Sequence, residues 1–138
     1  MPDLSVCEKC LSLSSAVLSL EGDFEESRQT RIIYNMLAEQ TSELGAAVNA
    51  VNYLPLSARK DHMPELVKFV QRVIYNLNLA RREGLFGDKR LAEALSLAVA
   101  VANDIGLAVR QYCGDMPEGA APPQSAAVNM PDGFDMPY

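Results

Sequence analysis

The sequence lacks tryptophan and has a single histidine, His62, among its 138 residues. One histidine excludes the paired Glu-x-x-His motifs that build di-iron sites inside helical bundles. No glycine-rich phosphate loop follows a strand, and no two acidic residues stand out as a general acid and base. We therefore predict a protein that is not an enzyme and needs no cofactor.

Cysteine is also scarce, with three residues in the chain. An odd number does not fit a complete disulfide framework of the kind found in small secreted proteins. No apolar run looks long enough to cross a bilayer, and the N-terminus lacks the basic and apolar blocks of a secretory signal. We therefore expect a cytoplasmic protein without a membrane partner.

Basic residues are outnumbered by acidic ones, which gives a net charge of −6 at pH 7. This balance argues against a protein built mainly to hold nucleic acid. The charge is uneven, however: residues 1–56 carry three basic and eight acidic side chains, residues 57–113 carry nine and six, and residues 114–138 carry none and four. A mildly basic half therefore lies between two acidic segments.

Helical periodicity runs through most of the chain, and no strand-like alternation interrupts it. The pattern predicts four helices: one from Asp3 or Ser5 to a turn at 21–23, one from Phe24 to Pro55, one over 61–83 and one over 88–113. Apolar side chains at steps of three and four mark the inward faces. In the two central helices these are Tyr34, Leu37, Thr41, Leu44, Val48 and Val51, then Leu66, Val70, Val73, Leu77 and Ala80.

Short connections between long helices favour antiparallel neighbours. We therefore predict an all-α protein, an antiparallel up-down-up-down four-helix bundle over residues 1–113. Residues 114–138 repeat Met-Pro three times and contain no basic residue. Such a segment has little to bury, and it is expected to form a Pro/Met-rich acidic tail that is extended or disordered.

Four of five residues recur at a distance of 41: RIIYN at 31–35 returns as RVIYN at 72–76, with Val73 in place of Ile32. The recurrence has two explanations. Both segments lie on central helices that bury an aliphatic face, and this requirement alone can select similar residues. The other explanation is a duplicated helical hairpin. The flanking residues do not match, which favours the first.

The stretch from Ala46 to Tyr112 carries a sequence pattern of its own. A helix end with Asn49 and Asn52 leads to a basic loop, and a long amphipathic helix ends in ARREGL at 80–85. The final helix opens with KRL at 89–91 and contains an Ile-Gly step at 105–106. This pattern resembles the intervening-sequence four-helix-bundle family. That family includes proteins encoded in bacterial 23S rRNA intervening sequences and accessory variability proteins of diversity-generating retroelements.

The resemblance implies a homo-oligomeric ring, often of five protomers, and service to a reverse transcriptase and its RNA. On this basis the expected function is that of a non-enzymatic oligomeric accessory or scaffold protein. Two alternatives stay open: an adaptor module that binds only protein, and a protein with a metal or thiol site at one end of the bundle.

The basic side of the third helix is the candidate surface for a partner or nucleic acid. Lys68, Arg72, Tyr75, Leu79 and Arg82 follow steps of three and four, so they share one exposed face. Further basic residues are expected at the helix ends beside it: Arg59, Lys60, Lys89 and Arg90. Arginine with an exposed aromatic ring is typical of interface anchors. The alternative is a solvated face whose aliphatic stems cover apolar surface.

The cysteines suggest a second candidate site. Cys7 and Cys10 are three residues apart, and the expected topology brings Cys113 and His62 to the same end of the bundle. Three sulfurs and one imidazole can form a tetrahedral zinc site. A reactive or disulfide-forming pair is a second explanation. A third is plain packing, because free cysteine behaves as a small hydrophobe. We expect packing, and no bound metal.

Overall fold

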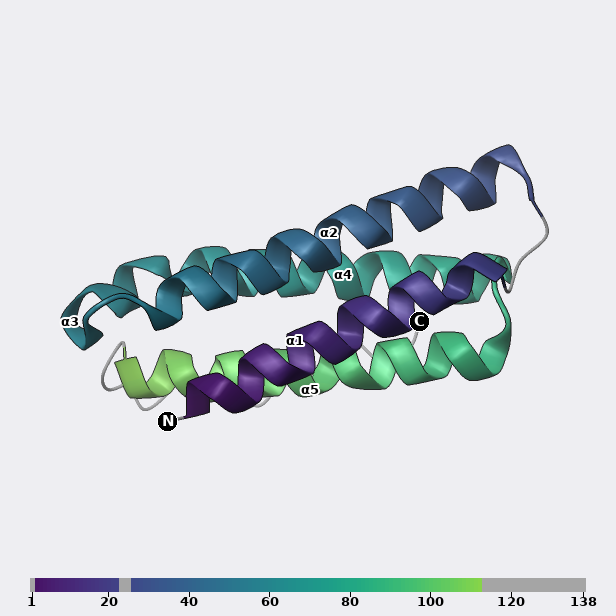
Figure 1. The fold of residues 1–138 in the computed structure, drawn as a ribbon. Coiled ribbons are helices and arrows are strands. Elements are labelled where there is room, and N and C mark those ends of the chain that lie inside the picture. Colours follow the sequence, from purple (N-terminus) through teal and green to yellow (C-terminus); the bar gives the residue numbers. More distant parts are fainter. Residues whose placement is uncertain (1, 23–25, 113–138) are drawn as a thin grey trace.

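A computed structural model describes residues 2–22 and 26–112 (Figure 1), so Cys113 and the predicted tail over 114–138 lie outside the described residues. Four long helices make up the described chain: α1 (Pro2–Leu18), α2 (Arg28–Asn52), α4 (Met63–Glu83) and α5 (Asp88–Tyr112). Short helical turns lie between them: η1 (Ser19–Gly22), α3 (Leu56–Arg59) and η2 (Lys60–His62).

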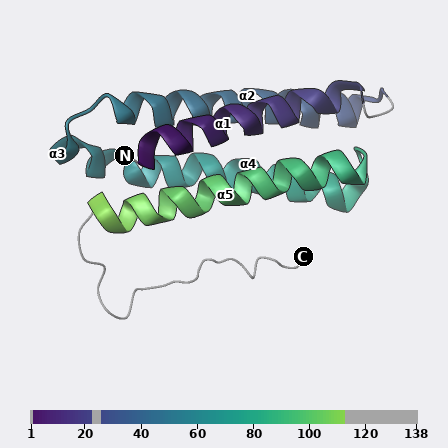
Figure 2. The ribbon, with the colours of Figure 1, turned by 60° about the horizontal axis from the view of Figure 1, so that its bottom comes forward.

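Each long helix packs against its two neighbours in the bundle. Helix α1 contacts α2 and α5, and α4 contacts the same two helices from the opposite corner. Helix α5 therefore closes the bundle by returning to α1, and consecutive long helices run antiparallel (Figures 1 and 2). The prediction of an all-α, up-down-up-down four-helix bundle is confirmed.

The core follows the predicted inward faces of the central helices. Every residue predicted to face inward on α2 and α4 is buried. On α5, spacing alone favours an inward face that includes Leu95 and Ala102, but these two are only partly buried, whereas Ala94 and Val101 are fully buried. On α1 the core is formed by Val6, Cys10, Leu13 and Val17.

Local chemistry sets the helix ends. The hydroxyl of Ser27 accepts a hydrogen bond from the backbone N–H of Thr30 over 3.1 Å, so α2 begins at Arg28. The predicted start near Phe24 is therefore wrong, because the capping serine comes later. Gly84 ends α4 with φ +64°, a left-handed conformation that favours glycine, and its N–H bonds to the carbonyl of Arg81.

The repeated segments occupy different environments. Tyr34 is 8% exposed whereas its counterpart Tyr75 is 68% exposed, and Asn35 is exposed whereas Asn76 is buried. The two segments thus turn different faces inward, and they are not equivalent parts of a duplicated hairpin.

Candidate functional site on the outer face of α4

The α4 stripe consists of Lys68, Arg72, Tyr75 and Arg82, all of which are exposed. These residues lie opposite the buried face of α4, which is centred on Val70, Val73 and Leu77. Leu79 lies within the stripe and is partly buried. The expectation of one exposed face is confirmed for Lys68, Arg72, Tyr75 and Arg82 but not for Leu79.

Neighbouring acidic side chains neutralise little of the positive charge on the α4 stripe. Arg72 lies 3.8 Å from Glu43 of α2, at the outer limit of an ion pair, and its guanidinium lies 5.4 Å from the centre of the Phe69 ring. Within the described part of the chain, Lys68 and Arg82 have no ion pair. An exposed pair at that distance contributes little to stability. The positive groups of the stripe are therefore available to a partner.

Arg59 does not belong to this surface, contrary to the sequence-based expectation. Its side chain is 7% exposed. The guanidinium donates to the backbone carbonyls of Asn52 (2.9 Å) and Leu54 (3.0 Å) and to the hydroxyl of Tyr112 (2.9 Å). These carbonyls lie at and just after the end of α2, where a cation is favoured by the helix dipole. Arg59 is therefore a structural residue.

The other predicted basic residues lie at three different places. Lys60 is exposed in η2, just before α4. Arg90 donates to the carbonyl of Ser19 over 3.4 Å, and Lys89 borders a shallow depression that also contains Ala16 of α1. Because Lys89 and Arg90 face α1, the expectation that they lie beside the α4 stripe is wrong.

The two described cysteines contact the interior and α2. Cys10 is 2% exposed, and burial, reinforced by the nearby Cys7 and Asp104, raises the pKa of its thiol to about 12. Cys7 is partly buried, and its sulfur accepts a hydrogen bond from the Asn52 amide over 2.8 Å. His62 is exposed in η2.

The candidate zinc ligands are not brought together. In the described ranges, 2–22 and 26–112, no three His, Cys, Asp or Glu side chains form a group that could hold a metal ion. Cys113 lies outside those ranges, but Cys7, Cys10 and His62 already fail to converge. The reason is the direction of the thiols, which lie against α2 and the core rather than toward η2.

The cavity at this end of the bundle is small. It has a volume of about 30 Å³ and is lined mainly by aliphatic residues, together with Asn52, Arg59, Asp104 and Tyr112. That volume is enough for about one water molecule, whereas ligand pockets usually measure several hundred Å³. This cavity therefore cannot take a substrate of ordinary size.

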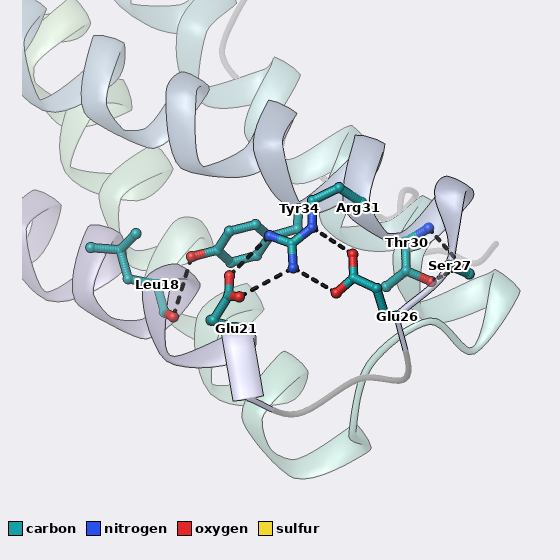
Figure 3. Close-up of polar contacts among 7 residues, drawn as sticks. All are labelled: Leu18, Glu21, Glu26, Ser27, Thr30, Arg31 and Tyr34. Carbon is teal, nitrogen blue, oxygen red and sulfur yellow. Dashed lines mark hydrogen bonds and ion pairs between the residues drawn. The ribbon is translucent and has the colours of Figure 1, made fainter.

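Sequence reasoning missed an arginine clamp at the opposite end of the bundle (Figure 3). Arg31 of α2 donates two hydrogen bonds to Glu21 (3.1 Å each) and two to Glu26 (2.8 and 2.7 Å). Hydrogen bonding to Arg31 holds the pKa of both carboxyl groups below the usual range. The clamp fixes η1 against the start of α2. The sequence does not show that Arg31 and the two glutamates lie within hydrogen-bonding distance of one another.

One described helix, α5, is long and apolar enough to cross a membrane by length and mean hydropathy alone. This finding corrects the expectation that no such segment exists. Helix α5 meets this criterion because Asp104 is the one charged residue between Glu93 and Arg110. Core helices of bundles without any membrane contact pass the same test, so the feature does not assign a location.

No family model, curated protein or solved structure matches this chain. The resemblance to the intervening-sequence family therefore stays a prediction, and so does every partner that it implies.

Proposed function

We propose that the protein is a non-enzymatic accessory or scaffold protein that binds RNA, in a complex with a reverse transcriptase, through the α4 stripe. One observation carries the proposal: three exposed basic residues and an exposed tyrosine share the outer face of one helix in a chain whose net charge is −6. The partners named in this proposal, a reverse transcriptase and its RNA, are those that the resemblance found in the sequence implies.

The chemistry of the α4 stripe suits a phosphate backbone. Lys68 and Arg82 are 14 positions apart, which corresponds to about 21 Å along a helix. Lysine and arginine contact phosphates, and arginine can bind them through two parallel hydrogen bonds. The Tyr75 ring lies between the charges and is 68% exposed, so an unpaired base can stack on it.

A protein partner is the second candidate, and a different observation favours it. Gln40 and Asn76 are bonded across the α2–α4 contact, and Glu43 faces Arg72. The same antiparallel register places Met36 of α2 at the level of Leu79. Met36 and Ile32 are 37% and 49% exposed. An acidic amphipathic helix would use such apolar side chains beside the α4 stripe, whereas an RNA backbone would not.

The test is fluorescence anisotropy with a labelled 20-nucleotide single-stranded RNA of mixed sequence at several salt concentrations. The triple variant Lys68→Glu, Arg72→Glu, Arg82→Glu is compared with a control, Arg28→Glu, Lys89→Glu, Arg110→Glu. The control makes the same change in net charge at exposed positions away from the α4 stripe. We expect at least a tenfold loss of affinity and a shallower salt dependence in the first variant only.

Equal losses in both variants would mean that the net charge, and not the α4 stripe, governs binding. No binding by the wild-type chain at low salt would contradict the RNA proposal. The pair Ile32→Ser and Met36→Ser distinguishes the two candidates, because it leaves the charges intact. Loss of binding to a purified protein partner in that pair, with RNA affinity unchanged or absent, would favour the adaptor function.

A further inference from the structure

Helix α4 contains the densest positive charge in the sequence. Residues 66–82 include four basic side chains and no acidic one: Lys68, Arg72, Arg81 and Arg82. No other stretch without an acidic residue contains as many basic residues. Three of the four belong to the α4 stripe and are exposed. Among the described helices, α4 is therefore the one to which a negatively charged segment is attracted most strongly.

Basic side chains of α1 and α2 already have acidic partners within the fold. Lys9 of α1 is paired with Asp104 over 2.8 Å, and Arg31 of α2 is held by the two glutamates of the arginine clamp. By contrast, the α4 stripe has one ion pair in the described ranges, the 3.8 Å contact between Arg72 and Glu43. The positive groups of the α4 stripe are therefore better able to take up additional carboxylates.

The C-terminal part of the chain has the opposite charge. We call residues 113–138 the acidic segment, because they include four acidic side chains and no basic one. The acidic side chains form two pairs, Asp115 with Glu118 and Asp132 with Asp135, and residues 119–131 between the pairs carry no charge. Negative charge is therefore concentrated at two places in the acidic segment.

Positive charge is also concentrated at two places on the α4 stripe. Lys68 and Arg72 are one helical turn apart, and Arg82, next to a second arginine, is ten positions beyond Arg72. Ten positions correspond to about 15 Å along a helix. The stretch from Glu118 to Asp132 can span up to about 46 Å when extended. Both acidic pairs can therefore reach the two basic places at the same time.

The acidic segment begins at the end of the bundle where α4 also begins. Helix α5 ends at Tyr112, whose hydroxyl accepts a hydrogen bond from Arg59, just before η2 and α4. Figures 1 and 2 show the last turn of α5 and the first turn of α4 at the same end. Lys68 is five positions beyond Met63, the first residue of α4, which corresponds to about 8 Å. The first acidic pair follows Tyr112 by three and six positions, a reach of about 10–20 Å.

Attachment to the same chain strengthens a weak attraction. An exposed ion pair between separate molecules contributes little to binding. A tethered segment has an effective concentration of roughly millimolar at a surface within its reach, so several weak pairs suffice to populate the contact. The attraction depends on salt, because the Debye length falls from about 30 Å at 0.01 M to about 8 Å at 0.15 M.

Apolar side chains beside the α4 stripe match the second acidic pair. Phe134 lies between the two aspartates of that pair. The register set by the Gln40–Asn76 hydrogen bond places Ile32 and Met36 of α2 near the level of Arg82. Ile32 is 49% exposed and Met36 is 37% exposed. Binding of the second pair to Arg82 therefore brings the Phe134 ring to exposed apolar surface, and its burial there is favourable.

We propose that the acidic segment binds along the α4 stripe of its own chain, with its first acidic pair against Lys68 and Arg72 and its second against Arg82. The acidic segment and RNA then compete for the same basic side chains. This competition rests on the proposed function, whereas the binding of the acidic segment does not. The acidic segment thus covers the α4 stripe until a partner with denser negative charge displaces it.

The test is cross-linking of the full chain with a carbodiimide, which joins a lysine amine to a carboxylate through an amide bond with loss of water. Trypsin releases residues 111–138 as one peptide, because no lysine or arginine follows Arg110. Mass spectrometry then identifies the lysine that is linked to this peptide. We expect links to Lys68 and at least fivefold fewer to Lys89, which is also exposed but faces α1. The yield at Lys68 should fall as the salt concentration is raised.

A matched pair of variants tests whether the charges of the α4 stripe hold the acidic segment. Arg72→Glu with Arg82→Glu keeps Lys68 available for linking, and it is expected to lower the yield at Lys68 at least threefold. The control Arg28→Glu with Lys89→Glu makes the same change in net charge at exposed positions away from the α4 stripe. It is expected to keep the wild-type yield, and circular dichroism checks the helix content of both variants.

Three results would overturn the proposal. The first is an equal yield at Lys68 and Lys89 in the wild type, and the second is an unchanged yield at Lys68 in the α4 stripe variant. The third comes from a mixture of chains labelled with nitrogen-14 and nitrogen-15. Links that form mainly between differently labelled chains would show that the acidic segment binds a second copy and not its own chain.

Competition with RNA is measured separately, by anisotropy at low salt. The variant Glu118→Gln, Asp132→Asn, Asp135→Asn is expected to bind the labelled RNA at least threefold more tightly than a control with the same net charge. The control, Glu8→Gln, Asp88→Asn, Glu93→Gln, changes exposed residues of α1 and α5. Links to Lys68 without RNA binding by any chain would support the binding of the acidic segment and contradict the proposed function. RNA binding without links to Lys68 would do the reverse.

Discussion

The guanidinium of Arg59 donates a hydrogen bond to the hydroxyl of Tyr112 over 2.9 Å, which connects the turn before α4 to the last residue of α5. The same guanidinium bonds to two backbone carbonyls at and after the end of α2. One side chain thus joins three segments at the end of the bundle where α2 stops and α4 begins. Of these contacts, the one with Tyr112 spans 53 residues of sequence.

Replacement of Arg59 is expected to destabilise the fold. Arg59→Ala leaves the carbonyls of Asn52 and Leu54 without this donor, and a loss of about 2–4 kcal/mol is expected because charged hydrogen bonds and buried polar groups are involved. Arg59→Lys should recover only part of this loss, because one ammonium group cannot reproduce the fork of guanidinium donors. Urea unfolding measures both, with Lys68→Ala as an exposed control. A loss below 1 kcal/mol for Arg59→Ala would contradict the structural role.

The hydrogen bond between the buried Asn76 and the half-buried Gln40 is expected to contribute to the register of α2 against α4. The Asn76 amide donates to the Gln40 carbonyl over 2.8 Å, and Asn76 is 4% exposed. A double-mutant cycle with Asn76→Ala and Gln40→Ala should give a coupling free energy of about 0.5–1.5 kcal/mol. Asn35→Ala, the exposed counterpart in the repeated segment, serves as the control and should show no coupling with Gln40→Ala.

The arginine clamp predicts a dependence of stability on pH. The pKa values of Glu21 and Glu26 are lower in the folded protein than the usual 4.5, because both carboxylates accept hydrogen bonds from Arg31. Their contribution to the free energy of unfolding is therefore present above pH 4.5 and is lost as the pH falls through the folded pKa values. Arg31→Gln should lower the midpoint of thermal unfolding at pH 7. In acid, the difference in midpoint between this variant and the wild type should disappear. The control Arg28→Gln should show no such pH-dependent difference.

The two described thiols should differ sharply in reactivity. Because the pKa of Cys10 is raised to about 12, only roughly one thiol in ten thousand is ionised at pH 8. Its sulfur is also buried, whereas Cys7 is partly accessible. In a Cys113→Ser background, iodoacetamide should modify Cys7 in the native state and Cys10 only after unfolding, as measured by peptide mass spectrometry. Modification of Cys10 at the rate of Cys7 would contradict this packing.

Periodicity in the sequence determined the number of helices, most of their ends and the buried faces of α2 and α4. These features depend on residues three or four positions apart and on local signals such as Gly84, so a one-dimensional pattern contains them. The 41-residue repeat shows the limit of comparing letters alone. Its matched residues Tyr34 and Tyr75 lie on different helices and differ in burial.

Tertiary structure alone decided which polar residues are buried and which faces adjoin. A basic residue in a loop looks like a binding residue, and only the nearby carbonyls and Tyr112 make Arg59 a buried structural group. Likewise, Lys9 of α1 and Asp104 of α5 are 95 residues apart in the sequence. They form an ion pair over 2.8 Å only because α5 returns to pack against α1. Periodicity describes one helix at a time, whereas a binding face depends on contacts between helices.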